Sequence, residues 1–348
     1  MTVSELGEHA LLARILARLP RPGAQILVGP GDDAAVIEPG RNHRLVVTTD
    51  ALVEHVHFSR AWSRPFDIGY KALAVNLSDL AAMGATPRWA LMSLALPDTL
   101  EAADVDGIVD GLAALARSAG VSVAGGNITR SPSGLVIDIT AGGDVKPRKW
   151  LTRSGARAGD ELWVSGSLGA GRAGLEKLKF GRRQTATGSQ DVGTADGSRQ
   201  TADDDGCIAR HLRPEPRVRL GVTMAKAGAA RAAMDISDGL ADAVRQLARA
   251  SGCGARVDGA LLPIHPEARA WWTERGEDAV GAAVAGGDDY ELLFAVPQRG
   301  GGRLRNVRRH VTEPVLTKIG VLTRDPALWL ERDGGRLPWP EGFEHFRA

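Results

Sequence analysis

The sequence predicts a mixed α/β (α+β) protein of two domains, and three observations carry that prediction. The chain has 348 residues, which exceeds the usual length of one domain. Short apolar runs alternate along it with stretches of helical periodicity. A basic, loop-like segment over 145–152 precedes a new strand-like run, ELWVSG. We therefore expect an N-terminal α/β domain over 1–148 and a C-terminal α/β domain over 149–348.

The N-terminal domain is expected to begin with an amphipathic helix. Thr2 and Glu5 have the spacing of a capping box, and Pro20 with Gly23 ends the helix. Its apolar stripe consists of Leu12, Ile15, Leu16 and Leu19. Charged residues interrupt the apolar stretch that a signal peptide would need, so we expect no cleaved leader here.

Five strands and two long helices follow in the N-terminal domain. The strands are expected near 24–28, 44–49, 88–96, 121–124 and 134–140, and the helices near 67–83 and 101–119. The run over 88–96 is apolar almost throughout, as expected for a strand that is covered on both faces.

The C-terminal domain repeats this mixture. Strands are expected near 161–165, 255–262, 290–296 and 315–322, and helices near 170–179, 214–227 and 239–250. Residues 181–205 contain almost no large apolar side chains and are rich in Thr, Ser, Gly and Asp. Because such a segment cannot offset its ordering entropy by burial, we expect a flexible polar insertion there.

Composition excludes several classes of protein. The 43 Lys and Arg nearly balance the 42 Asp and Glu, for a net charge of +1, so we expect no nucleic acid or membrane partner. The two cysteines, Cys207 and Cys253, form no CxxC pair. This excludes a disulfide scaffold or a cysteine zinc site and fits a reducing cytoplasm. No segment is long and apolar enough to span a bilayer.

Two glycine-rich segments each carry a pair of adjacent acids. Gly31-Asp32-Asp33 follows the first predicted strand, and Gly286-Gly287-Asp288-Asp289 precedes the strand YELLFAV. Glycines allow close approach of the backbone, and paired acids can ligate a hard cation. Each segment also fits a tight turn with solvated acids.

Polar residues close another predicted strand. Thr48, Thr49 and Asp50 are expected to leave the sheet together, and His57 follows seven residues later. These positions suit a ligand site at a strand end. The alternatives are an ordinary strand-end cap and a histidine that packs or makes surface hydrogen bonds.

The predicted helix over 67–84 carries polar residues within an apolar face. Asn76, Ser78 and Asp79 interrupt a run of Ala, Leu, Val and Met, and Asn76 and Asp79 share one side of the helix. Polar groups in such surroundings need partners or a lined cavity. Both a buried structural network and a metal or phosphate site satisfy this need.

A third acidic group precedes the helix LADAVRQLARA. Asp235, Ser237 and Asp238 are expected at its N-terminus, where they could hold a cation while free backbone N–H groups bind phosphate oxygens. Capping by Ser237 or Asp238 is the alternative. Acidic clusters without basic neighbours repel one another unless cations bind. Together they suggest several magnesium ions with a polyphosphate.

The segment Gly169–Gly174 matches GxGxxG formally. We do not expect a Rossmann site there, because the polar insertion follows in place of a complete βαβ unit. The chain contains no GxxxxGK[ST] loop either, so a nucleotide would be held without a Walker motif.

Several of these motifs occur in a fixed order along almost the whole chain. They are GDDAAV, TTDALVEHVHF, YKALAVNLSDLAAMGATP, GGNITRSP, LTRSGARAGDELWVSG, RHLRPEPRVRLG, DISDGL, GGDDYELLF and GFEHF. Together they resemble the thiamine-monophosphate kinase family of the aminoimidazole ribonucleotide synthetase-like superfamily. ALAVNLSDLAAMGA with DISDGL points to the superfamily, and HLRPEPR points to this member of it.

The resemblance implies the two-domain aminoimidazole ribonucleotide synthetase-like fold, in which the N-terminal sheet pairs across a homodimer and the C-terminal domain covers the ATP site. It also implies the reaction. ATP donates its γ-phosphoryl group directly to thiamine monophosphate, giving thiamine diphosphate and ADP, the last step of thiamine diphosphate biosynthesis. Mg²⁺ assists, and K⁺ does so in the family.

Roles for individual residues follow from the resemblance. The implied metal ligands are Asp33, Thr48, Thr49, Asp50, Asp79, Asn127, Asp235 and Asp238, with Asp32 in support. The implied catalytic residues are Asp33, Asp50, Asp238 and Arg153. The implied nucleotide contacts are Thr48, Thr49, Gly125, Gly126, Arg153 and Ser237, and those of thiamine monophosphate are His57, Asp288 and Phe343. Phe343 could stack on a flat ring or meet the thiazolium charge.

Two positions depart from the family pattern. Asn127 stands in GGN where many relatives have GGD, and Asp288 stands in GGDD where relatives usually have GGED. The amide offsets less cation charge, and the shorter acid lengthens a substrate contact or routes it through water.

Other functions fit the sequence less well than this resemblance does. Selenophosphate synthetase normally has a reactive cysteine or selenocysteine near its N-terminal glycine-rich segment, and the hydrogenase maturation factor ends in a cysteine. This sequence has neither feature, because its first cysteine is Cys207 and it ends EHFRA. A noncatalytic nucleotide and metal binding module and a Rossmann dehydrogenase are the alternatives from other classes. A test with ATP, magnesium and thiamine monophosphate separates them from the kinase.

Overall fold

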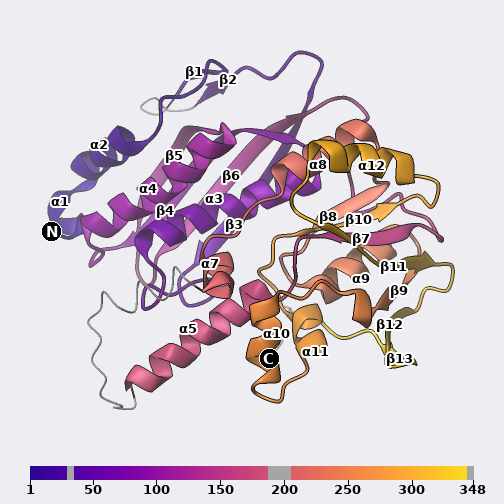
Figure 1. The fold of residues 1–348 in the computed structure, drawn as a ribbon. Helices are drawn as coiled ribbons and strands as arrows, with labels where there is room; N and C mark the ends of the chain where they lie inside the picture. The colour runs from indigo at the N-terminus through magenta and orange to yellow at the C-terminus, as the bar shows by residue number, and fades with distance from the viewer. Residues whose placement is uncertain (30–34, 187–204, 343–348) are drawn as a thin grey trace. The chain divides into compact units, whose positions relative to one another are not determined.

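The computed structural model of the chain describes residues 1–29, 35–186 and 205–342. The chain forms two units, one of Met1–Leu80 with Ala85–Trp150 and one of Ala81–Gly84 with Leu151–Ala348. Each unit has its own sheet with helices against it (Figure 1).

The first unit is built on a four-stranded sheet with the order β3-β6-β4-β5. Its strands are β3 (Arg44–Val53), β6 (Val136–Val145), β4 (Thr86–Pro97) and β5 (Ser122–Ser131). β6 is antiparallel to both of its neighbours, whereas β4 and β5 are parallel. Parallel neighbours need a crossover connection, which α4 (Ala102–Ala119) supplies.

Two helices lie against one face of this sheet, α3 (Pro65–Ala82) and α4 (Figure 1). They approach each other closely at glycines. A Cβ at Gly69 would overlap the carbonyl of Ile108, and one at Gly111 would overlap the carbonyl of Phe66. α3 is therefore buried along most of its length, including Asn76 and Ser78, which are 0% exposed.

The N-terminal segment forms two helices instead of the expected single helix. They are α1 (Val3–Leu6) and α2 (Glu8–Arg18), and Gly7 separates them with a φ of 78°. Such a conformation suits glycine and interrupts the helix. The capping box of Thr2 and Glu5 is confirmed. Short strands β1 (Ile26–Val28) and β2 (Val36–Ile37) pair beyond α2.

The second unit contains a seven-stranded sheet with the order β13-β12-β9-β11-β7-β10-β8. Its strands are β7 (Glu161–Ser165), β8 (Ala232–Asp235), β9 (Gly254–Asp258), β10 (Leu292–Val296), β11 (Leu316–Thr323), β12 (Leu328–Arg332) and β13 (Gly335–Pro338). Its helices are α5 (Ala170–Ala186), α7 (Gly206–Leu212), α8 (Val218–Ala227), α9 (Leu240–Ala250), η1 (Gly259–Leu261), α10 (Pro266–Thr273), α11 (Ala279–Ala285) and α12 (Gly301–His310).

Apolar cores lie on both faces of this sheet. In β10, Leu293 and Ala295 join the core with α9, α10 and α11, while Leu292, Phe294 and Val296 join the core with α8 and α12. Successive side chains of a strand point to opposite faces, so a doubly covered strand is apolar throughout. This explains the sequence LLFAV.

Several expected boundaries are wrong for local physical reasons. α5 continues to Ala186, so residues 181–186 of the expected insertion are helical, and 187–204 lie outside the described residues. α8 begins at Val218 and not near 214, because Pro214 and Pro216 favour an extended chain before it. The strand expected over 255–262 stops at Asp258, whose side chain caps η1.

A search of the described residues finds no helix with the length and apolar character that a membrane span requires.

Candidate active site

Two acid-rich loops of the second unit are joined by backbone hydrogen bonds. β8 ends at Asp235, which pairs with Leu292 of β10. Beyond it, Asp288 N donates to Ser237 O at 2.7 Å and Tyr290 N donates to Ile236 O at 2.9 Å. The segments DISDG and GGDDYE thus lie side by side at the edge of the sheet. Asp235, Ser237, Asp238 and Asp288 are held in one neighbourhood by the backbone.

Glycines make this close pairing possible. A Cβ at Gly287 would lie 2.6 Å from the carbonyl oxygen of Ser237. Gly239 has a φ of 92° and is the N-cap residue of α9, so the capping role considered for Ser237 or Asp238 is wrong. The polar residues of DISDG therefore directly precede a helix N-terminus, where anions are stabilised.

Asp288 contacts two residues that the sequence analysis did not single out. Its Oδ2 lies 3.2 Å from Nδ1 of His211, which is buried on α7, and its Oδ1 accepts the hydroxyl of Tyr290 at 3.1 Å. Asp288 has a φ of 67°, in the left-handed region that few non-glycine residues adopt. Its side chain stays 31% exposed. His211 opens the motif HLRPEPR, which was the available signal.

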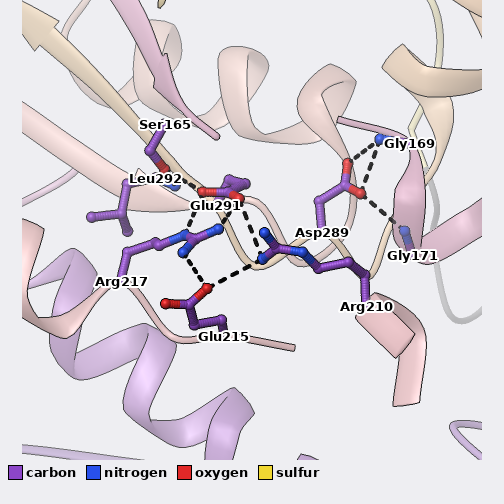
Figure 2. Close-up of polar contacts among 9 residues, drawn as sticks. All are labelled: Ser165, Gly169, Gly171, Arg210, Glu215, Arg217, Asp289, Glu291 and Leu292. Carbon is purple, nitrogen blue, oxygen red and sulfur yellow. Dashed lines mark hydrogen bonds and ion pairs between the residues drawn. The ribbon is translucent and has the colours of Figure 1, made fainter. Parts of the chain in front are cut away.

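The neighbouring acid, Asp289, has a structural role. Its carboxylate accepts the backbone N–H of Gly169 at 2.8 and 2.9 Å and that of Gly171 at 3.2 Å (Figure 2). The glycine-rich segment after β7 thus binds a carboxylate of its own chain. Burial raises the pKa of Asp289 to about 8, although both backbone donors lower it.

Asp289→Asn is expected to change how stability depends on pH. The pKa of Asp289 is about 8 in the folded state and 3.8 for the free side chain. Between these two pH values, the folded state therefore holds a proton on Asp289 that the unfolded state has lost. The stability that Asp289 contributes is therefore lost as pH rises from about 4 through 8. Urea titrations measure the free energy of unfolding of the wild type and of Asp289→Asn. The wild-type value minus the variant value should fall as pH rises over this range. A difference independent of pH would contradict the raised pKa.

The last acid of GGDDYE, Glu291, forms a buried ion pair. It accepts Nε of Arg217 at 2.7 Å, a second guanidinium nitrogen at 2.5 Å and the hydroxyl of Ser165 at 2.5 Å (Figure 2). The two charged side chains are 4% and 2% exposed. Arg217 also contacts Glu215 at 2.7 Å. HLRPEPR therefore fixes the position of GGDDYE.

Arg153 lies beside α9 in the second unit. Its guanidinium donates to Oε1 of Gln246, and Gln246 donates to Asp242 one turn earlier. The hydroxyl of Ser251 donates to the backbone carbonyl oxygen of Arg153 at 3.2 Å. The chain of contacts orients Arg153 along the exposed side of α9, while the residue itself stays exposed.

In the first unit, β3 places its polar residues on opposite faces. Thr48 donates to Oδ2 of Asp79 on α3 at 2.5 Å. Thr49 instead contacts Asp138 at 3.0 Å and Thr140 at 3.1 Å, both on β6. The expectation that Thr48, Thr49 and Asp50 leave the sheet together is wrong, because β3 continues to Val53 and successive side chains alternate.

His57 follows β3 in a tight turn. Its imidazole Nδ1 accepts the backbone N–H of Val53 at 3.0 Å, and the backbone N–H of His57 donates to the carbonyl oxygen of Val53 at 2.9 Å. The imidazole is half-buried. His57 therefore organises the end of β3.

The GGN segment borders a hollow of about 870 Å³ in the first unit. Gly125, Gly126 and Asn127 line it together with Asp138 and Thr140, the two side-chain partners of Thr49. A Cβ at Gly126 would overlap the carbonyl of Met92 on β4. Glycine at this position therefore lets β5 lie against β4. Asp138 is a polar lining residue that the sequence analysis missed.

Comparisons with known proteins agree across the chain. The model "AIR synthase related protein, N-terminal domain" matches residues 31–145, and that of the C-terminal domain matches 157–301. The thiamine-monophosphate kinase of Escherichia coli (strain K12) is 39% identical over 98% of both chains. The chain belongs to the thiamine-monophosphate kinase family.

Solved structures of this family share its fold. The thiamine-monophosphate kinase of Stenotrophomonas maltophilia K279a is 37% identical, with a TM-score of 0.75 over 94% of this chain and 95% of that one. A structure described as "AaThiL complexed with AMPPCP and TMP" is 33% identical, with a TM-score of 0.73 over 99% of both chains. The two-domain fold expected from the resemblance is confirmed.

The structure of this thiamine-monophosphate kinase family member brings some of the expected site residues together within each unit. Thr48 and Asp79 are paired in the first unit, and Asp235, Ser237, Asp238 and Asp288 are grouped in the second. Asp32, Asp33 and Phe343 lie outside the described residues. The assigned metal, nucleotide and substrate roles stay predictions.

Asp79→Asn distinguishes a metal ligand from a structural network. Asparagine can still accept the hydroxyl of Thr48, so we expect folding to be retained. If Asp79 ligates magnesium, kcat/KM should fall about 10²-fold, because a charged ligand is lost. Kinase assays with circular dichroism measure both effects. Asp110→Asn, an exposed change on α4, is the control. Full activity of Asp79→Asn would show that the pair is only structural.

Proposed function

We propose that the chain transfers the γ-phosphoryl group of ATP to thiamine monophosphate, giving thiamine diphosphate and ADP. The observation that carries this function is full-length similarity at 39% identity to a thiamine-monophosphate kinase. A relative of similar fold binds AMPPCP and TMP. The acidic loops add physical support, since clustered carboxylates suit a reaction between phosphate groups.

The oxygen-rich groups fit magnesium as the metal. Asp79 with Thr48 and the DISDG loop with Asp235 and Asp238 offer carboxylate and hydroxyl oxygens, which are the ligands that this hard cation prefers. We propose these side chains as magnesium ligands, with Asp33, Asp50, Thr49 and Asn127 as the remaining candidates. Magnesium, when bound, neutralises charge on transferring phosphates. We also propose K⁺ as a second cofactor and a homodimer as the assembly.

The chain's own contribution is to hold anions in position. The N-terminus of α9 follows Ser237 and Asp238, and we propose that its free backbone N–H groups bind a phosphate group. A hydrogen bond to Gln246 holds Arg153 beside the same helix, and we propose that the guanidinium of Arg153 binds the nucleotide. We propose that His57 and Asp288, which the turn after β3 and the paired loops hold in place, bind thiamine monophosphate, together with Phe343.

General base catalysis is unnecessary in this reaction. The acceptor oxygen belongs to a phosphate monoester, whose second ionisation has a pKa of about 6, so it is ionised at neutral pH. The barrier is dominated by repulsion between two anions, which preorganised positive groups lower by alignment and charge stabilisation.

An acceptor panel tests the proposed function. The purified chain is incubated with ATP and magnesium and with thiamine monophosphate, free thiamine or selenide, and the products are separated by chromatography. We expect thiamine diphosphate from thiamine monophosphate and no phosphorylated product from the other two. Binding of ATP by calorimetry without any thiamine diphosphate would favour a noncatalytic nucleotide and metal binding module instead.

A further inference from the structure

A group of potential metal ligands lies in the second unit apart from the residues assigned to the kinase reaction. The ligand atoms of Cys207, His265 and Glu267 all lie within 4.8 Å of one another. Cys207 is in the first turn of α7, His265 is the N-cap residue of α10, and Glu267 is in the first turn of α10. The group therefore joins two helix N-termini.

The spacing of the sulfur and nitrogen atoms matches a tetrahedral metal centre. Cys207 Sγ lies 3.6 Å from Nδ1 of His265. Zinc binds sulfur at about 2.3 Å and imidazole nitrogen at about 2.0–2.1 Å, so the two ligands of one tetrahedral ion are about 3.6 Å apart. A small movement of the exposed Glu267 side chain would bring in the third ligand.

The three side chains differ in how far they are exposed to solvent. Cys207 is 0% exposed, His265 is half-buried and Glu267 is exposed, so an ion can enter from the side of Glu267. Gly206 keeps this space open. A Cβ there would lie 3.0 Å from Oε1 of Glu267 and 3.3 Å from the His265 ring.

The local charges favour a divalent cation. Lys177 Nζ lies 2.7 Å from Asp205 but 3.9 Å from Glu267, so its ammonium compensates Asp205 first. With a Cys207 thiolate, the negative charges of Cys207, Asp205 and Glu267 outnumber the positive charge of Lys177, which favours a cation. Arg210 also acts on His265, but its guanidinium lies 3.6 Å from Glu215. Burial lowers the pKa of His265, which keeps the imidazole neutral and able to bind a metal. Burial also raises the pKa of the Cys207 thiol to about 12, so metal binding displaces its proton.

We propose that Cys207, His265 and Glu267 form a binding site for a divalent transition metal of the zinc class. Thiolate and imidazole ligands select such ions over magnesium, and three protein ligands leave a fourth position for water. The lack of a CxxC pair in the sequence argues only against a zinc site of closely spaced cysteines. Here the cysteine and histidine are 58 residues apart, so only the fold brings them together.

Cobalt binding to the full chain tests the site. The metal-stripped protein is titrated with Co²⁺ in excess Mg²⁺, which saturates oxygen-only sites, and near-ultraviolet absorbance reports charge transfer from thiolate to cobalt. We expect one equivalent of Co²⁺ to produce this band and Zn²⁺ to remove it. The band should be lost in Cys207→Ser, and Co²⁺ should bind at least about tenfold more weakly in His265→Ala and Glu267→Gln.

Cys253→Ser is the matched control, because Cys253 is the other buried cysteine and donates to Ser251 instead. This variant should keep the full cobalt band. Circular dichroism checks that each variant is folded, and His265→Ala and Glu267→Gln decide the matter if Cys207→Ser does not fold. No thiolate band in the wild type, or an unchanged affinity in His265→Ala and Glu267→Gln, would overturn the proposal.

Discussion

Replacing Asp238 with asparagine is expected to lower kcat for thiamine diphosphate formation about 10²–10³-fold. Removing a charged magnesium ligand costs several kcal/mol of charge stabilisation in the transition state, and about 1.4 kcal/mol corresponds to tenfold in rate. Folding should be preserved, since backbone bonds from Asp288 and Tyr290 hold the DISDG loop and asparagine has nearly the same shape. Initial rates at saturating ATP and thiamine monophosphate measure the effect.

Asp333→Asn is the control for this experiment. Asp333 is 89% exposed in the turn between β12 and β13, with a φ of 52° that asparagine also tolerates. It should leave kcat and the unfolding transition unchanged. Near-normal turnover of Asp238→Asn would reject its assignment as a metal ligand.

Replacing Arg217 with methionine is expected to destabilise the second unit by about 3–5 kcal/mol, because the change leaves Glu291 buried without its principal counter-charge. Ser165 and the more distant Arg210, 4.0 Å away, remain as partners. Urea denaturation followed by tryptophan fluorescence measures the loss. Activity at a temperature where the variant is folded should fall as well, since Glu291 lies in the GGDDYE loop.

Two further variants isolate the ion pair. Adding Glu291→Met to Arg217→Met should restore part of the lost stability, because an uncompensated buried charge is removed. Arg219→Met, which removes an exposed arginine bonded to the His310 carbonyl at 2.6 Å, should cost about 1 kcal/mol or less. A double variant less stable than Arg217→Met alone would show that charge burial is not the main cost.

Local sequence predicted the elements whose signals are local. The capping box at Thr2 and the amphipathic helix after Gly239 occur where their spacing indicated. The end of β3 could not be predicted in this way. TTD was read as a strand end, but pairing with β6 continues to Val53 opposite Val136. Sequence spacing does not show the cross-strand partners that extend β3 to Val53. Within the continuing strand, Thr48 and Thr49 point to opposite faces.

The candidate site was predictable only in part for a similar reason. The acid-rich motifs were visible, yet nothing local separates Asp288, which we propose as a substrate contact, from Asp289, which binds the N–H of Gly169 across 120 residues of sequence. Likewise, Arg217 meets Glu291 across 74 residues. The roles of Asp289 and Arg217 depend on these long-range contacts, which the fold of the second unit brings about and which sequence spacing does not show.

Single-turnover transfer from ATP labelled in its γ-phosphoryl group tests the central claim most directly. With magnesium and thiamine monophosphate present, we predict that the label appears in the terminal phosphoryl group of thiamine diphosphate, with one ADP formed for each product molecule. Label released only as inorganic phosphate, or retained covalently on the protein, would contradict direct transfer between the two substrates.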